Sequence, residues 1–168
     1  VNGDSNPKVF QAARKDTIEA WGVIGTAIKA YDYMDGTKNR YGVHSVMLVV
    51  DGEEVFQSTV DRFSSYEDRM INSWTDNLYM KSFIEPGNTI RMLQASNGNR
   101  GLVTINEEKD YHFLYILKDV YGNTRRFNFI VRGKEMPVPP PLPKDKYYFV
   151  WNKMNYLYEP GMALIIPQ

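Results

Sequence analysis

The side chains best suited to hold a catalytic metal are two histidines, His44 and His112, in a chain that has no cysteine. Zinc hydrolases hold their metal through closely spaced motifs such as His-Glu-x-x-His or His-x-His. Neither histidine lies in such a motif, and His44 shares strand parity with Val46 and Leu48. We therefore interpret the histidines as strand-end or interface residues, and we expect no catalytic residue, no metal site and no cofactor in this chain.

Oxygen-bearing side chains offer no better catalytic arrangement. The sequence has no cysteine for thiol chemistry and no Gly-x-Ser-x-Gly motif of the serine hydrolases. Its 20 acidic residues contain many carboxylate pairs, but no spacing selects one for glycoside hydrolysis. Four turn residues carry oxygens that calcium could bind, namely Asp32, Asp35, Asp119 and Asn123. We favour the alternative that these oxygens accept hydrogen bonds from backbone N–H groups at strand ends.

Aromatic residues are abundant, with 12 Tyr, 8 Phe and 3 Trp. Most of them fall at inward-facing positions of the expected strands, which favours a structural role. The exceptions lie in or beside irregular segments and are Trp21, Trp74, Tyr79 and Tyr156. Because exposed aromatic rings present flat apolar faces on which sugar rings stack, Trp21, Tyr79 and Tyr156 are the candidates for a glycan-stacking platform.

Composition excludes several classes of protein. The 20 Lys and Arg residues balance the 20 Asp and Glu residues, so there is no basic excess to neutralise nucleic-acid phosphates. An apolar fraction of 43% is ordinary for a globular domain. The longest apolar run is about five residues, Val46 to Val50, so we expect no membrane span, and Val1 opens no signal peptide.

Alternating apolar residues predict short strands over most of residues 17–134, separated by turns rich in Gly, Asn and Asp. The Asp51-Gly52 pair is the strongest hairpin signal, because both residue types tolerate positive φ. Roughly six or seven strands at this spacing predict an all-β fold, an antiparallel immunoglobulin-like β-sandwich. The expected core positions are Ile28, Ala30, Val46, Leu48, Val50, Phe113, Tyr115, Leu117, Phe127 and Phe129.

A short helical insertion interrupts this pattern over residues 62–83. Ser64 and Glu67 have the spacing of a capping box, which predicts a helix of two or three turns. The insertion also carries apolar residues at helical spacing, namely Phe63, Met70, Ile71 and Trp74.

The two ends of the chain differ from the expected sandwich. Residues 1–16 form a polar lead segment, and residues 135–146 form a proline-rich linker, whose prolines favour the polyproline II conformation. Residues 147–168 contain two strand-like runs, which are too few to bury an independent core. We interpret this segment as a short β extension or as the start of a truncated second β module.

The run from Tyr111 to Leu117 is apolar on both strand faces, because Leu114 and Ile116 lie opposite Phe113 and Tyr115. A strand with one face in water should alternate between apolar and polar residues. We therefore expect the second face to be covered by the 62–83 insertion, by the C-terminal strands or by a partner. The candidate interaction surface consists of Leu114, Ile116, Phe63 and Trp74.

Five short stretches are also characteristic of a known family: AYDYMDG, VDGEEVF, VDRFS, SFIEPGN and DVYGNT. With the sequence around them, residues 17–134 closely resemble the region that follows the catalytic domain in envelope metallopeptidases of the lysostaphin/LytM type, peptidase family M-twenty-three. Residues 146–168 resemble the start of the next β module in these proteins, more weakly.

The resemblance implies a non-catalytic accessory domain of a peptidoglycan-targeting zinc metalloendopeptidase in the bacterial cell envelope, periplasmic or secreted. In that family the catalytic domain binds zinc through a His-x-x-x-Asp pair and a His-x-His motif. Neither can be carried over, because the fourth residue after His44 is Leu48 and the fourth after His112 is Ile116. Zinc is therefore expected only in a catalytic domain that this chain lacks.

Two departures from the family suggest a fragment. Relatives usually have a longer segment between Trp74 and Met80, which looks abbreviated here at Asp76-Asn77-Leu78. Relatives also continue beyond the position of Gln168.

Three hypotheses follow from the sequence. The leading one is an accessory domain whose partner is the missing catalytic domain of the same protein, with peptidoglycan or another envelope glycan as a further ligand. The second is a glycan-binding β-sandwich module that uses exposed Trp and Tyr residues. The third, enzymatic activity in this chain itself, has no motif to support it.

Overall fold

The structure is a computed structural model, and it describes residues 9, 17–30, 32–33, 40–41, 43–61, 64–65, 67–76, 79–135, 147–150 and 164–167. The chain divides into two compact units, residues 1–135 and residues 136–168. In the second unit, β14 (Tyr147–Val150) and β15 (Leu164–Pro167) pair as antiparallel strands. All further description concerns the first unit.

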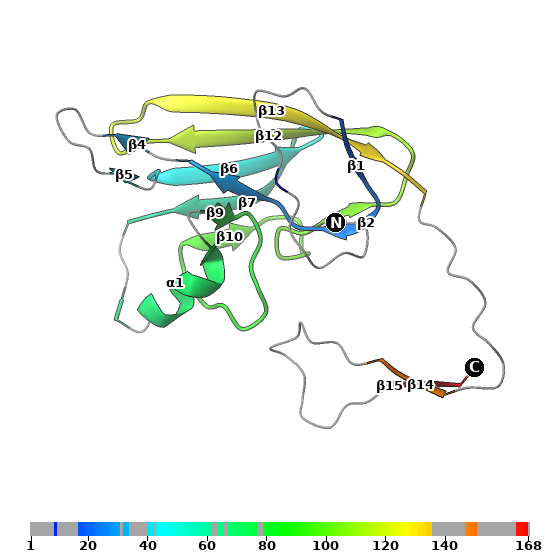
Figure 1. The fold of residues 1–168 in the computed structure, drawn as a ribbon. Coiled ribbons are helices and arrows are strands. Elements are labelled where there is room, and N and C mark those ends of the chain that lie inside the picture. The colour runs from blue at the N-terminus through cyan, green and yellow to red at the C-terminus, as the bar shows by residue number, and fades with distance from the viewer. Residues whose placement is uncertain are drawn as a thin grey trace. The chain divides into compact units, whose positions relative to one another are not determined.

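Strands dominate the described part of the first unit, as the all-β expectation requires (Figure 1). In chain order its elements are β1 (Ile18–Ala20), β2 (Gly22–Ile24), β3 (Ala27–Lys29), β4 (Asp32–Tyr33), β5 (Arg40–Tyr41), β6 (Ser45–Val50), β7 (Glu53–Thr59), α1 (Asp68–Trp74), β8 (Thr75–Asp76), β9 (Tyr79–Lys81), β10 (Leu93–Ala95), β11 (Val103–Ile105), β12 (Asp110–Lys118) and β13 (Thr124–Gly133).

The largest sheet has six strands in the order β1-β13-β12-β6-β7-β10. Its long central pairs are antiparallel, and Tyr115 on β12 lies between Leu48 on β6 and Phe127 on β13. The expectation of a purely antiparallel arrangement is wrong at one edge, where β1 runs parallel to the end of β13. Two strands so far apart in the sequence are free to pair in either direction, since no tight turn joins them.

The hairpin between β6 and β7 turns at Asp51 and Gly52, as predicted, with φ values of 50° and 89°. The pairing of the two strands shifts between Leu48 and Val49, which leaves Val55 as an extra residue on β7. This bulge places two successive side chains, Val55 and Phe56, in the core instead of one.

None of the ten expected core residues is exposed. Val46, Leu48 and Val50 on β6 are buried, as are Phe113, Tyr115 and Leu117 on β12. The remaining positions are half-buried and pack against this core: Ile28, Ala30, Phe127 and Phe129. The two phenylalanines lie on β13, beside an edge that the three-residue β1 covers only in part. The ring of Phe129 stacks on that of Phe113 at 5.1 Å between centroids.

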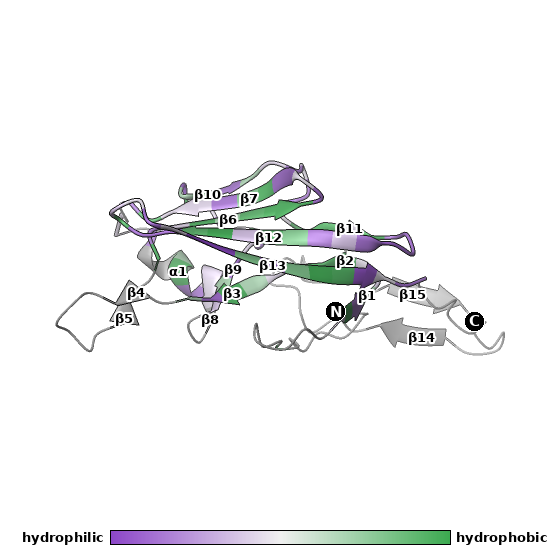
Figure 2. Cartoon of the chain, turned by 90° about the horizontal axis from the view of Figure 1, so that it is seen from above, coloured by the Kyte–Doolittle hydropathy of each residue, from purple (hydrophilic) through white to green (hydrophobic). Residues whose placement is uncertain are grey.

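A second layer of small elements packs on the face of the large sheet that carries Tyr115, here called the inner face. It consists of the β2–β11 pair, the three-stranded sheet β3-β9-β8 and α1. Buried residues from this layer, including Ile24, Met80 and Ile105, belong to the same cluster as Leu48 and Phe113. In Figure 2, α1 and the β3-β9-β8 sheet lie on the same side of β6 and β12.

A buried hydroxyl joins the two layers. The hydroxyl of Tyr115 is hydrogen-bonded to Thr26 Oγ1 at 2.7 Å and to Ser82 Oγ at 2.8 Å. Thr26 connects β2 to β3, and Ser82 follows β9. Burial raises the pKa of Tyr115 to about 12, although both hydrogen bonds oppose this rise.

The hydrogen bonds of the expected capping box form, but they lie in a turn that precedes the helix, whose N-cap residue Glu67 has no side-chain cap bond. Glu67 accepts hydrogen bonds from the Ser64 backbone N–H at 2.9 Å and hydroxyl at 2.8 Å, and the Glu67 N–H donates to Ser64 Oγ at 3.3 Å. These reciprocal bonds are those of a capping box. The α-helix itself starts at Asp68 and is seven residues long. In the described part of the chain, no helix combines the length and apolarity needed to cross a membrane.

We expect Phe113→Ala to lower the free energy of unfolding by about 3–5 kcal/mol, because it removes a fully buried ring from the centre of the sheet. Phe129→Ala should cost less, since that ring is only half-buried. Urea denaturation followed by circular dichroism measures both values. An equal or larger cost at Phe129 would contradict the described core.

We expect Tyr115→Phe to lower the free energy of unfolding by about 1–3 kcal/mol at neutral pH, because it leaves the buried Ser82 hydroxyl and the half-buried Thr26 hydroxyl short of a partner. The folded protein holds the Tyr115 proton more tightly than the unfolded chain, so this residue's contribution to stability falls as the pH rises from about 10 to about 12. Urea denaturation across this range should therefore show a shallower alkaline loss in the variant. Identical slopes in the two proteins would contradict the buried network.

Candidate interaction surface

The opposite face of the large sheet, here called the outer face, carries a block of four apolar side chains. The register places Ile116 opposite Met47, and Leu114 opposite Val49, on the adjacent strands β12 and β6. All four side chains are half-buried. Further along the same face, Ile130 on β13 is 42% exposed and lies opposite His112.

Polar residues border this apolar block on both sides. On β7, Gln57 lies opposite Met47, and Glu54 lies opposite Val49. On β13, Arg126 lies opposite Ile116, and Asn128 opposite Leu114. An apolar centre with a polar border is the usual anatomy of a protein-binding patch.

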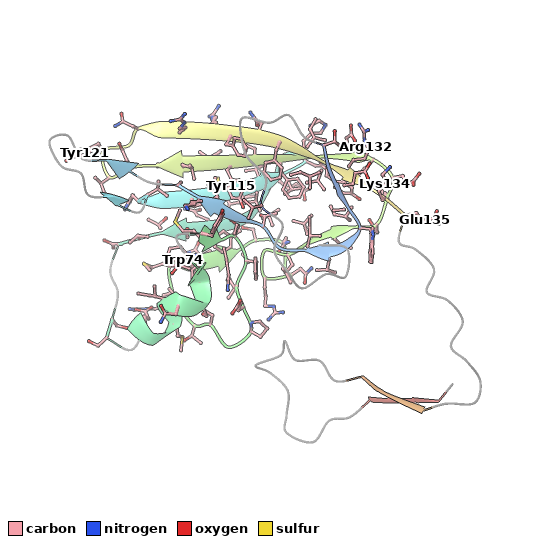
Figure 3. The ribbon with its side chains drawn as sticks, viewed as in Figure 1. Trp74, Tyr115, Tyr121, Arg132, Lys134 and Glu135 are labelled. Atoms are coloured by element: carbon pink, nitrogen blue, oxygen red, sulfur yellow. The ribbon has the colours of Figure 1, made fainter. Side chains whose placement is uncertain are left out.

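The described residues of the helical insertion do not supply the cover expected for Leu114 and Ile116. Met70 and Ile71 of α1 pack against the inner-face core, and Trp74 is itself a buried member of that core. The indole Nε1 of Trp74 donates to the Lys81 carbonyl at 3.0 Å, and Figure 3 shows the ring beside α1. Trp74 is therefore corrected from an interaction residue to a structural one. Phe63 lies outside the described residues.

Sequence reasoning missed half of the apolar block, although the signal was present. The run Ser45–Val50 reads SVMLVV and is apolar at both parities, as the β12 run is. The expected core includes only the parity of Val46 and Leu48, and it gives Met47 and Val49 no role. A strand that is apolar on both faces, next to another of the same kind, marks a face that needs a cover.

The glycan-stacking candidates do not form a platform in the described part of the chain. Trp21 and Tyr79 are both half-buried, and the Lys29 ammonium lies 5.5 Å from the centre of the Tyr79 ring. Tyr156 lies outside the described residues. Sequence analysis did not select Tyr121, which is 78% exposed in the turn between β12 and β13 (Figure 3). Its place in the Asp119–Asn123 turn was the available signal.

That turn uses its acidic residue as a backbone acceptor. Asp119 Oδ1 accepts the N–H groups of Tyr121 at 2.9 Å and Asn123 at 2.8 Å, and Oδ2 accepts the Asn123 side-chain amide at 2.6 Å. The bond from the Asn123 side chain is the main cause that lowers the pKa of Asp119. At this position, the structure has the arrangement that we favoured over a calcium site.

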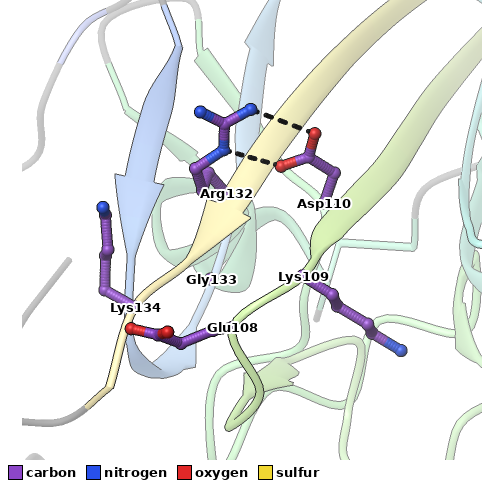
Figure 4. Close-up of a pocket in the computed structure, with 6 residues that line it drawn as sticks. All are labelled: Glu108, Lys109, Asp110, Arg132, Gly133 and Lys134. Carbon is purple, nitrogen blue, oxygen red and sulfur yellow. Dashed lines mark hydrogen bonds and ion pairs between the residues drawn. The ribbon is translucent and has the colours of Figure 1, made fainter.

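A shallow depression of about 200 Å³ lies where β12 and β13 meet the end of β1 (Figure 4). Its lining residues are Glu108, Lys109, Asp110, Arg132, Gly133 and Lys134. Arg132 donates to both carboxylate oxygens of Asp110, at 2.8 and 3.2 Å, and this bond lowers the pKa of Asp110. Lys134 pairs with Glu19 at 3.2 Å, and Lys109 with Glu107 at 3.5 Å. The cations that line the depression are therefore engaged with carboxylates of the chain itself.

A second groove, of about 340 Å³, lies between the β6–β7 hairpin, the 96–102 loop and β11. The exposed carboxylates of Asp51, Glu53 and Glu54 contribute to its lining. Ser96 donates its hydroxyl to Glu54 at 3.1 Å, and the backbone N–H of His112 donates to Asp51 at 2.8 Å. Within the described residues, no group of His, Cys, Asp and Glu side chains could hold a metal ion.

The insertion is attached to the 85–95 segment through a buried carboxylate. Glu67 is buried and accepts bonds from Arg91 through the backbone N–H at 3.2 Å and through Nε at 3.3 Å. The side-chain bond from Arg91, followed by the bonds from Ser64, lowers the pKa of Glu67 to about 2.

Comparisons with known proteins add no relative to this description. No family model, no curated protein and no solved structure matched the chain.

We expect Glu67→Gln to reduce the acid sensitivity of the fold. The Glu67 pKa of about 2 lies below its ordinary value of 4.5, so its contribution to stability is present above pH 4.5 and is lost as the pH falls towards 2. Urea denaturation at several pH values between 5 and 2 should show a smaller loss of stability in the variant than in the parent. Asp61→Asn, at an exposed carboxylate, is the control and should leave the loss unchanged.

Proposed function

We propose that residues 17–134 form a non-catalytic interaction domain that binds a partner protein through the outer face of its large sheet. The finer fold that we propose is an immunoglobulin-like β-sandwich, in which the small sheets take the place of the second sheet. Support for this fold comes from the single core cluster shared by β6, β12 and the small sheets.

One observation carries the proposed function. Met47, Val49, Leu114 and Ile116 form a contiguous apolar block on two central strands, and none of them belongs to the hydrophobic core of the domain. Leaving such surface in water costs about 25 cal/mol for each Å². A partner that covers the block removes this cost, and the bordering polar side chains of Glu54, Gln57 and Arg126 set its orientation.

The partner that we propose is the catalytic domain of the same protein, a zinc metalloendopeptidase that acts on peptidoglycan in the bacterial envelope. This part of the proposal rests on the resemblance of residues 17–134 to the accessory region of peptidase family M-twenty-three. Zinc would be bound in that catalytic domain alone. The domain described here would hold or position it, without supplying a reacting group.

Glycan binding is the alternative function. It has less support, because Trp21 and Tyr79 are half-buried and the Lys29 ammonium lies near the Tyr79 ring. The exposed ring of Tyr121 is the one observation in its favour.

We expect Leu114→Asp to weaken binding of the separately produced catalytic domain at least about tenfold, because the contact would bury an unpaired carboxylate. Isothermal titration calorimetry with the 168-residue chain measures the effect, and circular dichroism tests that the variant folds. Thr104→Asp is the matched control, since Thr104 is exposed on β11, outside the large sheet. It should bind as the parent does.

Two results would contradict the proposal. One is equal binding by folded Leu114→Asp and by the control. The other is loss of binding to peptidoglycan strands in Tyr121→Ala with no measurable binding of the catalytic domain, which would favour the glycan-binding alternative.

A further inference from the structure

The outer edge of β13 has backbone groups that no described residue pairs. β13 runs from Thr124 to Gly133, but β1 pairs only with its last three residues, Val131 to Gly133. The preceding stretch, residues 124–130, is bonded to β12 on one side. Its other side has no described neighbour in the sheet order.

The backbone hydrogen bonds identify which groups point outward. The N–H of Gly133 donates to Lys109, on the β12 side, at 2.8 Å, whereas that of Lys134 donates to Ala20, on the β1 side, at 2.9 Å. Because the direction alternates along a strand, even-numbered residues direct their N–H and C=O groups to the outer edge. The pairing of Ile18 with Val131 takes up the Ile130 carbonyl. The outward groups without a described strand partner are therefore the N–H and C=O groups of Thr124, Arg126 and Asn128, together with the N–H of Ile130.

The side chains along this edge indicate the chemistry of an occupant. Arg125 and Arg126 are exposed, and among the described residues none forms a hydrogen bond or ion pair with their guanidinium groups. Towards the other end of the edge, the half-buried rings of Phe127 and Phe129 lie on the inner face, and the 42% exposed Ile130 lies on the outer face. The edge is thus cationic at its start and apolar at its end.

We propose that the edge of β13 between Thr124 and Ile130 binds an extended acidic segment of a partner protein by β-strand addition. The backbone of that segment would bond to the outward N–H and C=O groups of Arg126 and Asn128 and to the N–H of Ile130. One or two of its carboxylates would pair with Arg125 and Arg126, and apolar side chains would lie beside Phe129 and Ile130. A segment of about seven residues spans the stretch.

Charge favours this occupant over a second copy of the chain. Charged side chains on an edge strand commonly prevent identical edges from pairing. A two-fold pair of identical edges is antiparallel, so Arg125 and Arg126 of each copy would lie near the apolar end of the other copy without a counter-charge, whereas an acidic strand neutralises both arginines. The site is the edge of the sheet and not its outer face, so the inference does not rest on the proposed function.

The test uses the full chain and two synthetic peptides, acetyl-Glu-Glu-Val-Thr-Val-Thr-Val-amide and its reversed order, because the edge accepts parallel or antiparallel strands. Fluorescence anisotropy measures their affinity, and amide hydrogen exchange followed by NMR reports protection residue by residue. We expect binding by at least one peptide, with protection of Arg126, Asn128 and Ile130. The same peptide with alternate amides N-methylated should not bind, because it cannot form the ladder.

Two variants separate backbone pairing from charge. Asn128→Pro removes one outward N–H, which is not used by the β12 pairing, and should weaken peptide binding about tenfold. Its matched control, Asn128→Ala, keeps the N–H and should bind as the parent does. The double variant Arg125→Glu with Arg126→Glu should no longer bind the acidic peptide. It should instead bind the corresponding peptide in which two lysines replace the two glutamates.

Several results would overturn the inference. These are no binding of either acidic peptide, equal binding of the N-methylated peptide, or equal effects of Asn128→Pro and Asn128→Ala. Dimerisation of the parent chain through protected edge amides, seen by analytical ultracentrifugation, would identify a second copy as the occupant instead. If circular dichroism shows that Asn128→Pro does not fold, the test rests on the charge-reversal variant. A charge-reversal variant that still prefers the acidic peptide over the Lys-Lys peptide would exclude the site. If Leu114→Asp fails to bind the catalytic domain but still binds the acidic peptide, the outer face and the β13 edge are separate sites, as the inference requires.

Discussion

The hydroxyl of Tyr115 is the constraint on which the arrangement of the domain depends. A buried phenol hydroxyl must keep its hydrogen bonds, because a buried hydroxyl without a partner pays the full free-energy cost of leaving water. Thr26 and Ser82 provide those bonds from two segments of the second layer. The same contact therefore fixes the small sheets over the middle of β12. It also decides which face of β12 is the inner one, and so which residues are left on the outer face.

The placement of Tyr115 on the inner face explains why the outer face is apolar. With Phe113, Tyr115 and Leu117 committed to the inner face, Leu114 and Ile116 must lie on the other side of the same strand. They cannot be moved inward by a shift of one residue, because such a shift would withdraw the Tyr115 hydroxyl from its partners and turn every core side chain of β12 outward. The apolar block is thus a fixed feature of the fold, and the α1 insertion is committed to the inner face.

The sequence was sufficient where the signal is local. The Asp51-Gly52 turn, the capping box of Ser64 and Glu67, and the inner parity of β6 and β12 all formed as predicted. The sequence was insufficient to predict which strands pair when they are far apart in the chain. The parallel pairing of β1 with β13 depends on tertiary contacts that no local pattern encodes. Trp74 shows the same limit, because its helical spacing indicated an apolar face without showing which side of the sheet that face would meet.

β13 has a different position from the other long strands, since it borders the apolar block and also forms an incompletely paired edge. Its even-numbered residues do both: the side chains of Arg126, Asn128 and Ile130 lie on the outer face, while their backbone groups point along the sheet to the open edge. A strand added at that edge would continue the sheet beyond β13 and place its own alternate side chains beside this border. Occupation of the edge would therefore widen the outer face, and the two surfaces are geometrically compatible. A partner that contributed both an extended segment and a folded domain would engage them together, and the arginines at the start of β13 would determine where the acidic end of its segment lies.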